Sequence, residues 1–148
     1  MSGGDGREIV LVRHAHAEWP AWQGRDFDRP LTPQGELDAL RTARAISDAG
    51  HLPALIVTSG ARRTRQTGEI IGRELALPED RQIFVDALYD GSAATLAHAL
   101  RDLARSTPGL LLLVAHNPGV SELARELGDL RTRPFAPGEW RLLPLQDA

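Results

Sequence analysis

Short apolar blocks separated by longer amphipathic stretches predict strands that alternate with helices along the chain. Four of these blocks are expected to be strands, at residues 8–12, 54–58, 82–85 and 110–115. Short runs of branched apolar residues without polar alternation are typical of parallel strands that are buried on both faces. A last strand at residues 139–145 is expected at a sheet edge, because Pro144 cannot donate a ladder hydrogen bond.

Helical spacing and capping residues predict a helix after each of the first four strands. Thr32 and Pro33 open the first helix and Gly50 closes it, with apolar residues at every third position from Leu37 to Ala49 expected to face inward. The other helices are expected at residues 63–75, from Ser92 to about residue 106, and from 118 to 127.

This alternation predicts one α/β domain, a three-layer α/β/α sandwich with a mostly parallel central sheet. The domain is expected to occupy residues 1–148, with residues 1–7 as a flexible tail. Ligands of such sheets bind at the carboxyl ends of the strands, so the residues that follow each strand are the candidates for a site. The sequence assigns no role to the loop at residues 132–138.

Composition narrows the chemistry that the chain can perform. The 148 residues carry 17 basic and 20 acidic side chains, a net charge of −3, and no cysteine. Every basic residue is arginine, which excludes lysine chemistry, and the absence of cysteine excludes a thiol nucleophile. Without a basic block, an apolar span or an apolar leader, we expect a cytoplasmic protein that binds neither nucleic acid nor membrane.

Histidines and arginines follow three of the predicted strands. The first strand ends in Arg13-His14-Ala15-His16, the second leads through Ser59 to Arg62 and Arg63, and the fourth ends in His116-Asn117. Together they predict a cationic pocket rich in hydrogen-bond donors, suited to a phosphoryl group. A neutral imidazole can attack phosphorus while guanidinium groups hold the oxygens, and this requires neither a metal nor a cofactor.

Four segments resemble the histidine phosphatase (phosphoglycerate mutase-like) superfamily. Arg13-His14-Ala15 resembles its Arg-His-Gly signature, residues 59–67 resemble its Ser-Pro-x-x-Arg-Ala-x-Gln-Thr segment, and His116 resembles its second histidine. Residues 29–35 and 115–119, with the short chain, are similar to the small SixA-type phosphohistidine phosphatases.

The resemblance implies a phosphatase that forms a phosphohistidine intermediate, with a phosphorylated protein or a small phosphorylated molecule as its partner. It implies that His14 is the nucleophile and that Arg13, Arg63 and His116 bind the phosphoryl group. Arg63 is preferred over Arg62 because the family arginine stands four residues after the serine. Arg29, Arg62, His16 and Asn117 are expected to bind substrate, although His16 is equally compatible with a solvated loop position.

Three departures from the family pattern bear on the substrate. Ala15 and Gly60 replace a glycine and a proline, and the chain has no clear equivalent of the carboxylic acid that mutase-type members use as proton donor. Asp86, Asp90 and Glu18 are the acids available for that role. An imidazole leaving group needs less acid assistance than an alkoxide, so the missing donor points toward phosphoramidate substrates and away from sugar phosphates or mutase chemistry.

Three other functions remain open at this stage. A phosphatase of small metabolites would use the same residues, and a non-catalytic phosphate-binding module would keep the arginines without turnover. A metal hydrolase is suggested by the spacing of His14 and His16, but the barrel that usually carries this spacing needs about 250 residues.

Overall fold

The computed structural model describes residues 7–19 and 23–145, which form a five-stranded sheet covered by helices on both faces. The strands are β1 (Glu8–Arg13), β2 (Pro53–Thr58), β3 (Gln82–Phe84), β4 (Leu110–Ala115) and β5 (Trp140–Pro144). Their order is β3-β2-β4-β1-β5, with parallel pairing except for β5, which runs antiparallel to β1. The predicted mostly parallel sheet and the edge position of the last strand are therefore confirmed.

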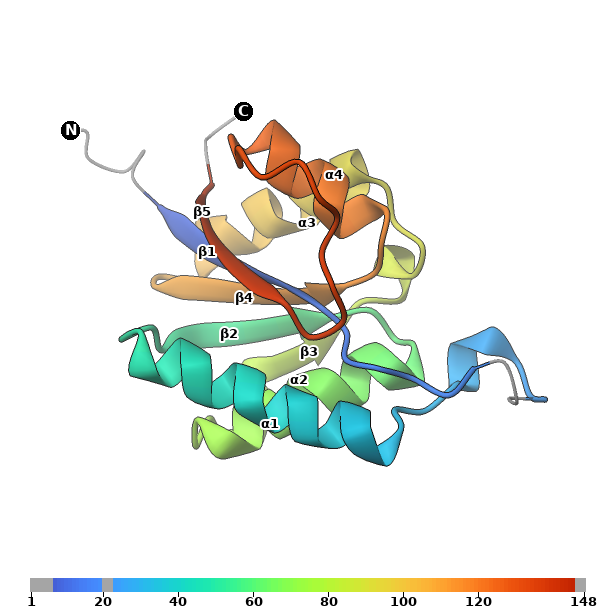
Figure 1. Cartoon of the computed structure of the whole chain (residues 1–148). Coiled ribbons are helices and arrows are strands. Elements are labelled where there is room, and N and C mark those ends of the chain that lie inside the picture. The colour runs from blue at the N-terminus through green and yellow to red at the C-terminus, as the bar shows by residue number, and fades with distance from the viewer. Residues whose placement is uncertain (1–6, 20–22, 146–148) are drawn as a thin grey trace.

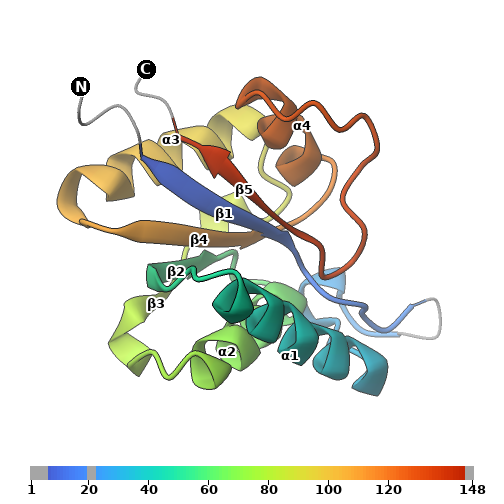
Figure 2. The same cartoon turned by 60° about the vertical axis from the view of Figure 1, so that its left-hand side comes forward.

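The helices form the two outer layers of the sandwich. They are α1 (Pro33–Asp48), α2 (Arg62–Glu74), α3 (Ala93–Ser106) and α4 (Gly119–Glu126). Helices α1 and α2 cover one face of the sheet, and α3 and α4 cover the other (Figures 1 and 2). Within the described ranges, none of the helices is long and apolar enough to cross a bilayer.

Strands β1, β2, β4 and β5 each contribute to two separate cores, because successive side chains point to opposite faces of the sheet. From β1, Ile9 and Leu11 pack with the α3 and α4 side, whereas Val10 and Val12 pack with the α1 and α2 side. All four are fully buried, as the uniformly apolar run predicts.

Helix α1 begins and ends as predicted, but the prediction of its buried face was partly wrong. Thr32 caps it through its side chain, which accepts a hydrogen bond from the Gly35 N–H, and Gly50 takes a φ of +85°. Leu37 and Ala49 are exposed, while Ala39, Ala43 and Ile46 are buried. A turn holds 3.6 residues, so positions three apart drift around the helix and cannot all share one face over five repeats.

The chain around Arg7 is anchored to the end of α3. Its guanidinium donates hydrogen bonds to the carbonyl oxygens of Ala104 (2.8 Å), Thr107 and Gly109 (2.8 Å). The rest of the predicted flexible tail, residues 1–6, lies outside the described residues.

Strand register places the ends of β1, β4 and β2 at one edge of the sheet. Arg13 pairs with Ala115, and Val114 pairs with Thr58 on the other side of β4. The residues that follow these three strands therefore emerge side by side, although they are separated by up to about a hundred positions in the sequence.

Candidate active site

The two predicted site histidines lie next to each other beyond the ends of β1 and β4. His14 follows Arg13 and His116 follows Ala115, and their imidazole centroids are 5.4 Å apart. The backbone N–H of His14 donates to the carbonyl of Ala115 (3.1 Å), which extends the pairing of the strands into the site. Both side chains are buried, at 8% and 5% relative exposure.

A hydrogen bond to the backbone fixes the protonation of the His14 ring. Its Nδ1 lies 2.8 Å from the carbonyl oxygen of Ala15, which can only accept, so Nδ1 carries the proton. Burial, with smaller contributions from the positive charges of Arg63 and Arg13 and from His116, lowers the pKa of His14 to about 3, although the Ala15 contact opposes this shift. His14 is therefore neutral at physiological pH, and its Nε2 has an unprotonated lone pair.

His116 is also neutral, and its ring is held by a hydrogen bond with Ser59. Its Nε2 lies 2.8 Å from the hydroxyl of Ser59, which in turn contacts the hydroxyl of Thr64 at 2.6 Å. Burial, and then the nearby charge of Arg63, lowers the pKa of His116 to about 4. Its Nδ1 is buried and has no hydrogen-bond partner among the described residues.

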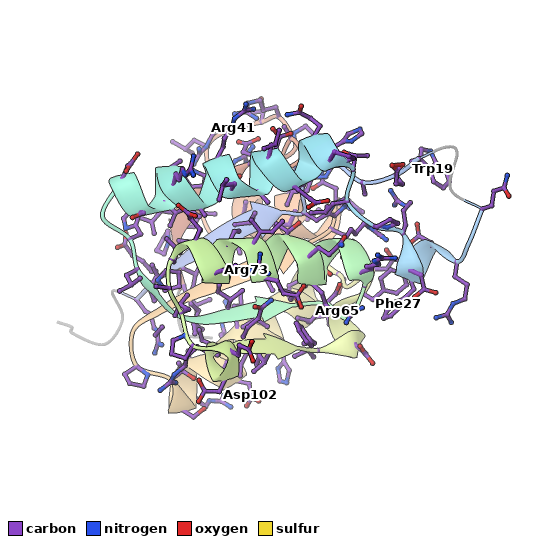
Figure 3. The ribbon with its side chains drawn as sticks, turned by 90° about the horizontal axis from the view of Figure 1, so that it is seen from below. Trp19, Phe27, Arg41, Arg65, Arg73 and Asp102 are labelled. Atoms are coloured by element: carbon purple, nitrogen blue, oxygen red, sulfur yellow. The ribbon has the colours of Figure 1, made fainter. Side chains whose placement is uncertain are left out.

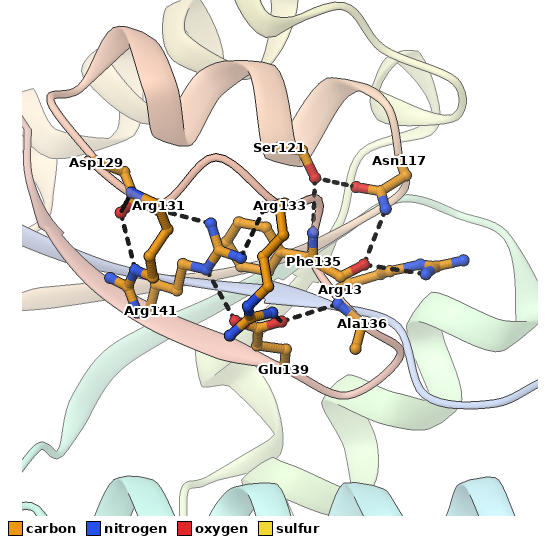
Figure 4. A network of polar contacts seen from close by, with 10 residues as sticks. All are labelled: Arg13, Asn117, Ser121, Asp129, Arg131, Arg133, Phe135, Ala136, Glu139 and Arg141. Atoms are coloured by element: carbon orange, nitrogen blue, oxygen red, sulfur yellow. Dashed lines mark hydrogen bonds and ion pairs between the residues drawn. The ribbon is translucent and has the colours of Figure 1, made fainter.

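Arg13 is oriented by a loop carbonyl from near the other end of the chain. Its Nη1 donates to the Phe135 oxygen (3.1 Å), which also accepts from the Asn117 amide (3.0 Å). The Asn117 Oδ1 accepts from the Ser121 hydroxyl at 2.5 Å. Asn117 thus contacts the loop that holds Arg13, as Figure 4 shows.

Arg141 of β5 also holds the loop that carries Phe135. It is 2% exposed and donates to the carboxylates of Asp129 (2.7 Å) and Glu139 (2.9 Å), and its guanidinium carbon lies 4.0 Å from the centre of the Phe135 ring (Figure 4). Burial raises the pKa of Glu139, but hydrogen bonds, first among them that from Arg133, lower it to about 2. The sequence assigned no role to the loop at residues 132–138. In the structure, this network holds the loop so that the Phe135 carbonyl contacts Arg13.

Arg63 enters the site from the first turn of α2 and is 4% exposed. Its Nη1 and Nη2 donate to the backbone oxygen (2.8 Å) and the carboxylate (3.0 Å) of Asp26. Its neighbour Arg62 is exposed, so the two adjacent arginines have different environments. A helix turns by about 100° per residue, which is why only one of an adjacent pair can point into the site.

Asp26 and Tyr89 are site residues that the sequence analysis missed. Asp26 lies in a short 3-10 helix, η2 (Asp26–Asp28), and its carboxylate accepts from Arg63, from Arg29 (3.1 Å) and from the Tyr89 hydroxyl. Burial raises its pKa, but the bonds from Tyr89, Arg63 and Arg29 lower it to about 2. The spacing of Asp26 and Arg29 predicts their ion pair, but no sequence signal predicts the contact with Arg63.

The predicted substrate-binding residues Arg29 and His16 make different contacts. Arg29 joins the Asp26 cluster and its guanidinium also contacts the Trp19 ring, with 5.2 Å to the ring centre. His16 is exposed, and its Nδ1 contacts the Thr32 hydroxyl at 2.9 Å, at the start of α1. The structure therefore brings Arg29 toward Arg63 and directs His16 to the helix cap.

Within the described residues, the side chains of the three acids considered as proton donors form no recorded hydrogen bond with the histidines and arginines of this cluster. Asp86 and Asp90 are exposed, and Glu18 is half-buried and contacts Arg29 through its backbone oxygen (3.3 Å). A Cβ built on Gly60 would lie 1.9 Å from the Asp86 carboxylate, so any larger residue there would displace that side chain.

The remaining residues of the matched motifs hold the site segments together. Gln66 accepts a hydrogen bond from the Leu31 N–H (2.8 Å), and Thr67 accepts one from the Ala15 N–H (3.1 Å), so α2 fixes the chain after β1. A Cβ on Gly35 would lie 2.0 Å from the His16 carbonyl oxygen, so only glycine allows α1 to approach this closely.

Three polar atoms in this cluster are buried without a partner in the described part of the chain: Arg13 Nε, Arg63 Nε and His116 Nδ1. Buried polar groups are almost always hydrogen-bonded, so unsatisfied ones in a single cluster indicate a ligand that supplies the missing partners. A phosphoryl group has three oxygens that can accept from such groups. No group of three or more potential metal ligands occurs in the described ranges.

Comparisons with known proteins agree with this geometry. The model of the histidine phosphatase superfamily (branch 1) matches residues 9–83. An uncharacterized chloroplastic protein of Arabidopsis thaliana is 35% identical over 128 residues, which are 82% of this chain but only 59% of that protein. An uncharacterized protein of Picosynechococcus is 31% identical over 120 residues, covering 81% of this chain and 72% of that one.

A solved structure shares the whole fold. SixA from Agrobacterium tumefaciens is 28% identical and superposes with a TM-score of 0.79, covering 93% of this chain and 91% of that one. The family model covers the segments that carry His14 and Arg63 but ends before His116. The chain belongs to the histidine phosphatase superfamily, and its fold is similar to that of SixA.

Proposed function

We propose that this domain hydrolyses phosphohistidine in a protein, with His14 as the nucleophile and no metal ion. The observation that carries the proposal is the state of the His14 ring, whose Nδ1 proton is committed to the Ala15 carbonyl. Its Nε2 lone pair is thereby left available beside two arginines, and burial keeps the ring neutral. An imidazole in this state is an activated nucleophile.

The reaction proceeds in two transfers at phosphorus. His14 Nε2 forms a bond to the phosphorus atom while the bond to the substrate imidazole nitrogen breaks, and the departing imidazole keeps that electron pair and takes a proton from water. A second water molecule then attacks the phosphorylated His14, releasing inorganic phosphate and the free histidine. Arg13, Arg63 and His116 bind the phosphoryl oxygens and stabilise their charge in both steps.

Three observations support phosphohistidine as the substrate. The similar structure from Agrobacterium carries the name of a phosphohistidine phosphatase. The one carboxylate in contact with the arginine cluster, among the described residues, is Asp26, and with a pKa of about 2 it cannot protonate an alkoxide leaving group. An imidazole leaving group places the smallest demand on a general acid.

Hydrolysis of an aryl phosphate with and without a metal chelator tests the mechanism. The unmodified protein is expected to turn over the substrate equally well in both conditions and to be inhibited by vanadate. His14→Ala is expected to lose at least a thousandfold in kcat, because it removes the attacking atom. His98→Ala, an exposed histidine on α3, is the matched control and should retain full activity.

The outcomes separate the alternatives. Activity that disappears in chelator would favour a metal hydrolase. Tight vanadate binding without turnover of the aryl phosphate or of a phosphohistidine protein would leave only a phosphate-binding module. Faster turnover of free small phosphates than of phosphohistidine proteins would contradict the proposed substrate but would be consistent with the proposed mechanism.

A further inference from the structure

The charges around the histidine pair match one phosphoryl group. Among the described residues of the cluster, Arg13, Arg29 and Arg63 each carry one positive charge and the Asp26 carboxylate carries one negative charge. His14 and His116 add none because both are neutral. The cluster therefore has a net charge of +2, which a single phosphoryl dianion neutralises.

Asp26 lies between the buried arginine and the solvent. The Arg63 side chain is 4% exposed, whereas that of Asp26 is 43% exposed. Asp26 occupies the Nη edge of the Arg63 guanidinium and leaves its buried Nε without a partner, so a phosphoryl group can bind the inner edge while the carboxylate holds the outer one. A leaving group that extends past Arg63 toward the solvent would therefore lie near this carboxylate.

The segment that carries Asp26 stands at the outer end of the site. Figure 3 shows Phe27, the next residue, beyond the start of α2 and on the same side of the molecule as Trp19. The Tyr89 ring lies 5.1 Å from the Phe27 ring and 5.6 Å from the His116 ring, centre to centre, and thus links this segment to the histidine pair. The Asp26 charge is therefore held in a fixed place at the opening.

We propose that Asp26 restricts the site to a single phosphoryl group on a neutral or cationic leaving group, the class to which a phosphorylated imidazole belongs. This inference rests on the proposed function and adds the feature that selects the substrate. A second phosphate or a carboxylate next to the scissile bond would meet the Asp26 carboxylate, and the cluster, which has no net charge left once the phosphoryl dianion is bound, gives it no compensation. Phosphoesters of anionic metabolites are thereby disfavoured.

Binding of two inert phosphonates measures this selection without turnover. Methylphosphonate carries one phosphonate group and methylenediphosphonate carries two, and calorimetry gives the affinity of each for the unmodified protein, Asp26→Asn and Asp28→Asn. Asp28 is the matched control because it lies on the same short helix and pairs with the exposed Arg25 at 3.0 Å. A second experiment measures the same selection during turnover, as the ratio of kcat/KM for 4-nitrophenyl phosphate to kcat/KM for 4-carboxyphenyl phosphate.

Asp26→Asn is expected to raise the affinity for methylenediphosphonate about tenfold relative to methylphosphonate, and to lower the kcat/KM ratio by a similar factor. Asp28→Asn should change either ratio less than twofold, and 0.5 M salt should reduce the effect of Asp26→Asn because it screens the charge. An unchanged ratio in Asp26→Asn, or an equal change in Asp28→Asn, would overturn the inference.

The two proposals can fail separately. If the unmodified protein hydrolyses phosphohistidine and the phosphonate ratio does not respond to Asp26→Asn, only the selection by Asp26 is wrong. If the protein hydrolyses no phosphorylated substrate, the proposed function is wrong, and the phosphonate ratios still decide whether Asp26 selects the ligand.

Discussion

At the scale of single residues, the site depends on histidines that stay neutral at pH values at which a free histidine side chain begins to take up a proton. Burial is the largest cause for both rings, and the positive charge of Arg63 adds to it. The folded-state pKa values are about 3 for His14 and about 4 for His116, against 6.5 for the ordinary side chain. Between these values the unfolded chain binds protons that the folded chain does not.

This difference predicts how stability depends on pH. The contribution of the two neutral histidines to the free energy of unfolding is complete above pH 6.5. It is lost as the pH falls from 6.5 toward 4, because the unfolded chain then binds more protons than the folded chain. Each histidine contributes up to about 1.4 kcal/mol per pH unit, which corresponds to a few °C in Tm for a domain of this size. Thermal melts of His14→Ala should show a shallower fall of Tm over this range, and those of His98→Ala should follow the unmodified protein.

At the scale of elements, the segment between α4 and β5 determines the position of a phosphate-binding residue. Arg141 holds its two ends through Asp129 and Glu139, and the Phe135 carbonyl at its middle binds Arg13. The two carboxylate side chains are 3% and 15% exposed, and Arg141, whose side chain is 1% exposed, is the buried cation that both of them contact.

Arg141→Met is expected to destabilise the domain by about 3 to 5 kcal/mol, because it removes the buried partner that both carboxylates share and leaves each paired with an exposed arginine. In the fraction that remains folded, KM for the aryl phosphate should rise more than kcat falls, since Arg13 loses its fixed orientation. Arg131→Met is the control: Arg131 contacts the same Asp129 (2.8 Å) but its side chain is 48% exposed, so its loss should cost less than about 1 kcal/mol. Denaturant melts and steady-state kinetics measure both effects, and equal losses in the two variants would contradict this role.

At the scale of the whole molecule, the site joins segments from most of the chain. His14 follows β1, Arg63 begins α2, His116 follows β4, and the loop before β5 orients Arg13. A ligand that binds these segments together binds only the folded state, so its binding energy adds to the stability of the entire domain.

Vanadate at a hundred times its dissociation constant is therefore expected to stabilise the unmodified protein by about 2.7 kcal/mol, which raises Tm by roughly 5 to 10 °C. Arg63→Met should lose most of this shift, because it removes the buried guanidinium that we propose binds the phosphoryl group. Arg62→Met should lose much less, since Arg62 is exposed. Differential scanning calorimetry decides between them, and the opposite ranking would transfer the phosphate-binding role to Arg62.

The sequence by itself determined the α/β sandwich, the order of its elements and the three strand ends that carry the site. These features are local: apolar runs mark buried strands, Thr32 and Ser92 mark helix starts, and parallel strands bring their carboxyl ends to one edge. The exposed Leu37 shows the limit of such patterns, because the buried face of a helix depends on what packs against it.

Only the tertiary structure decided which polar groups meet. The contact of Asp26 with Arg63 joins residues 37 positions apart, and the contact of Arg13 with the Phe135 carbonyl joins residues 122 apart. No periodicity or spacing encodes such pairs, because they arise from the paths of loops over a completed sheet. The same holds for the tautomer of His14, which is set by the backbone fold at Ala15 and not by the identity of any neighbouring side chain.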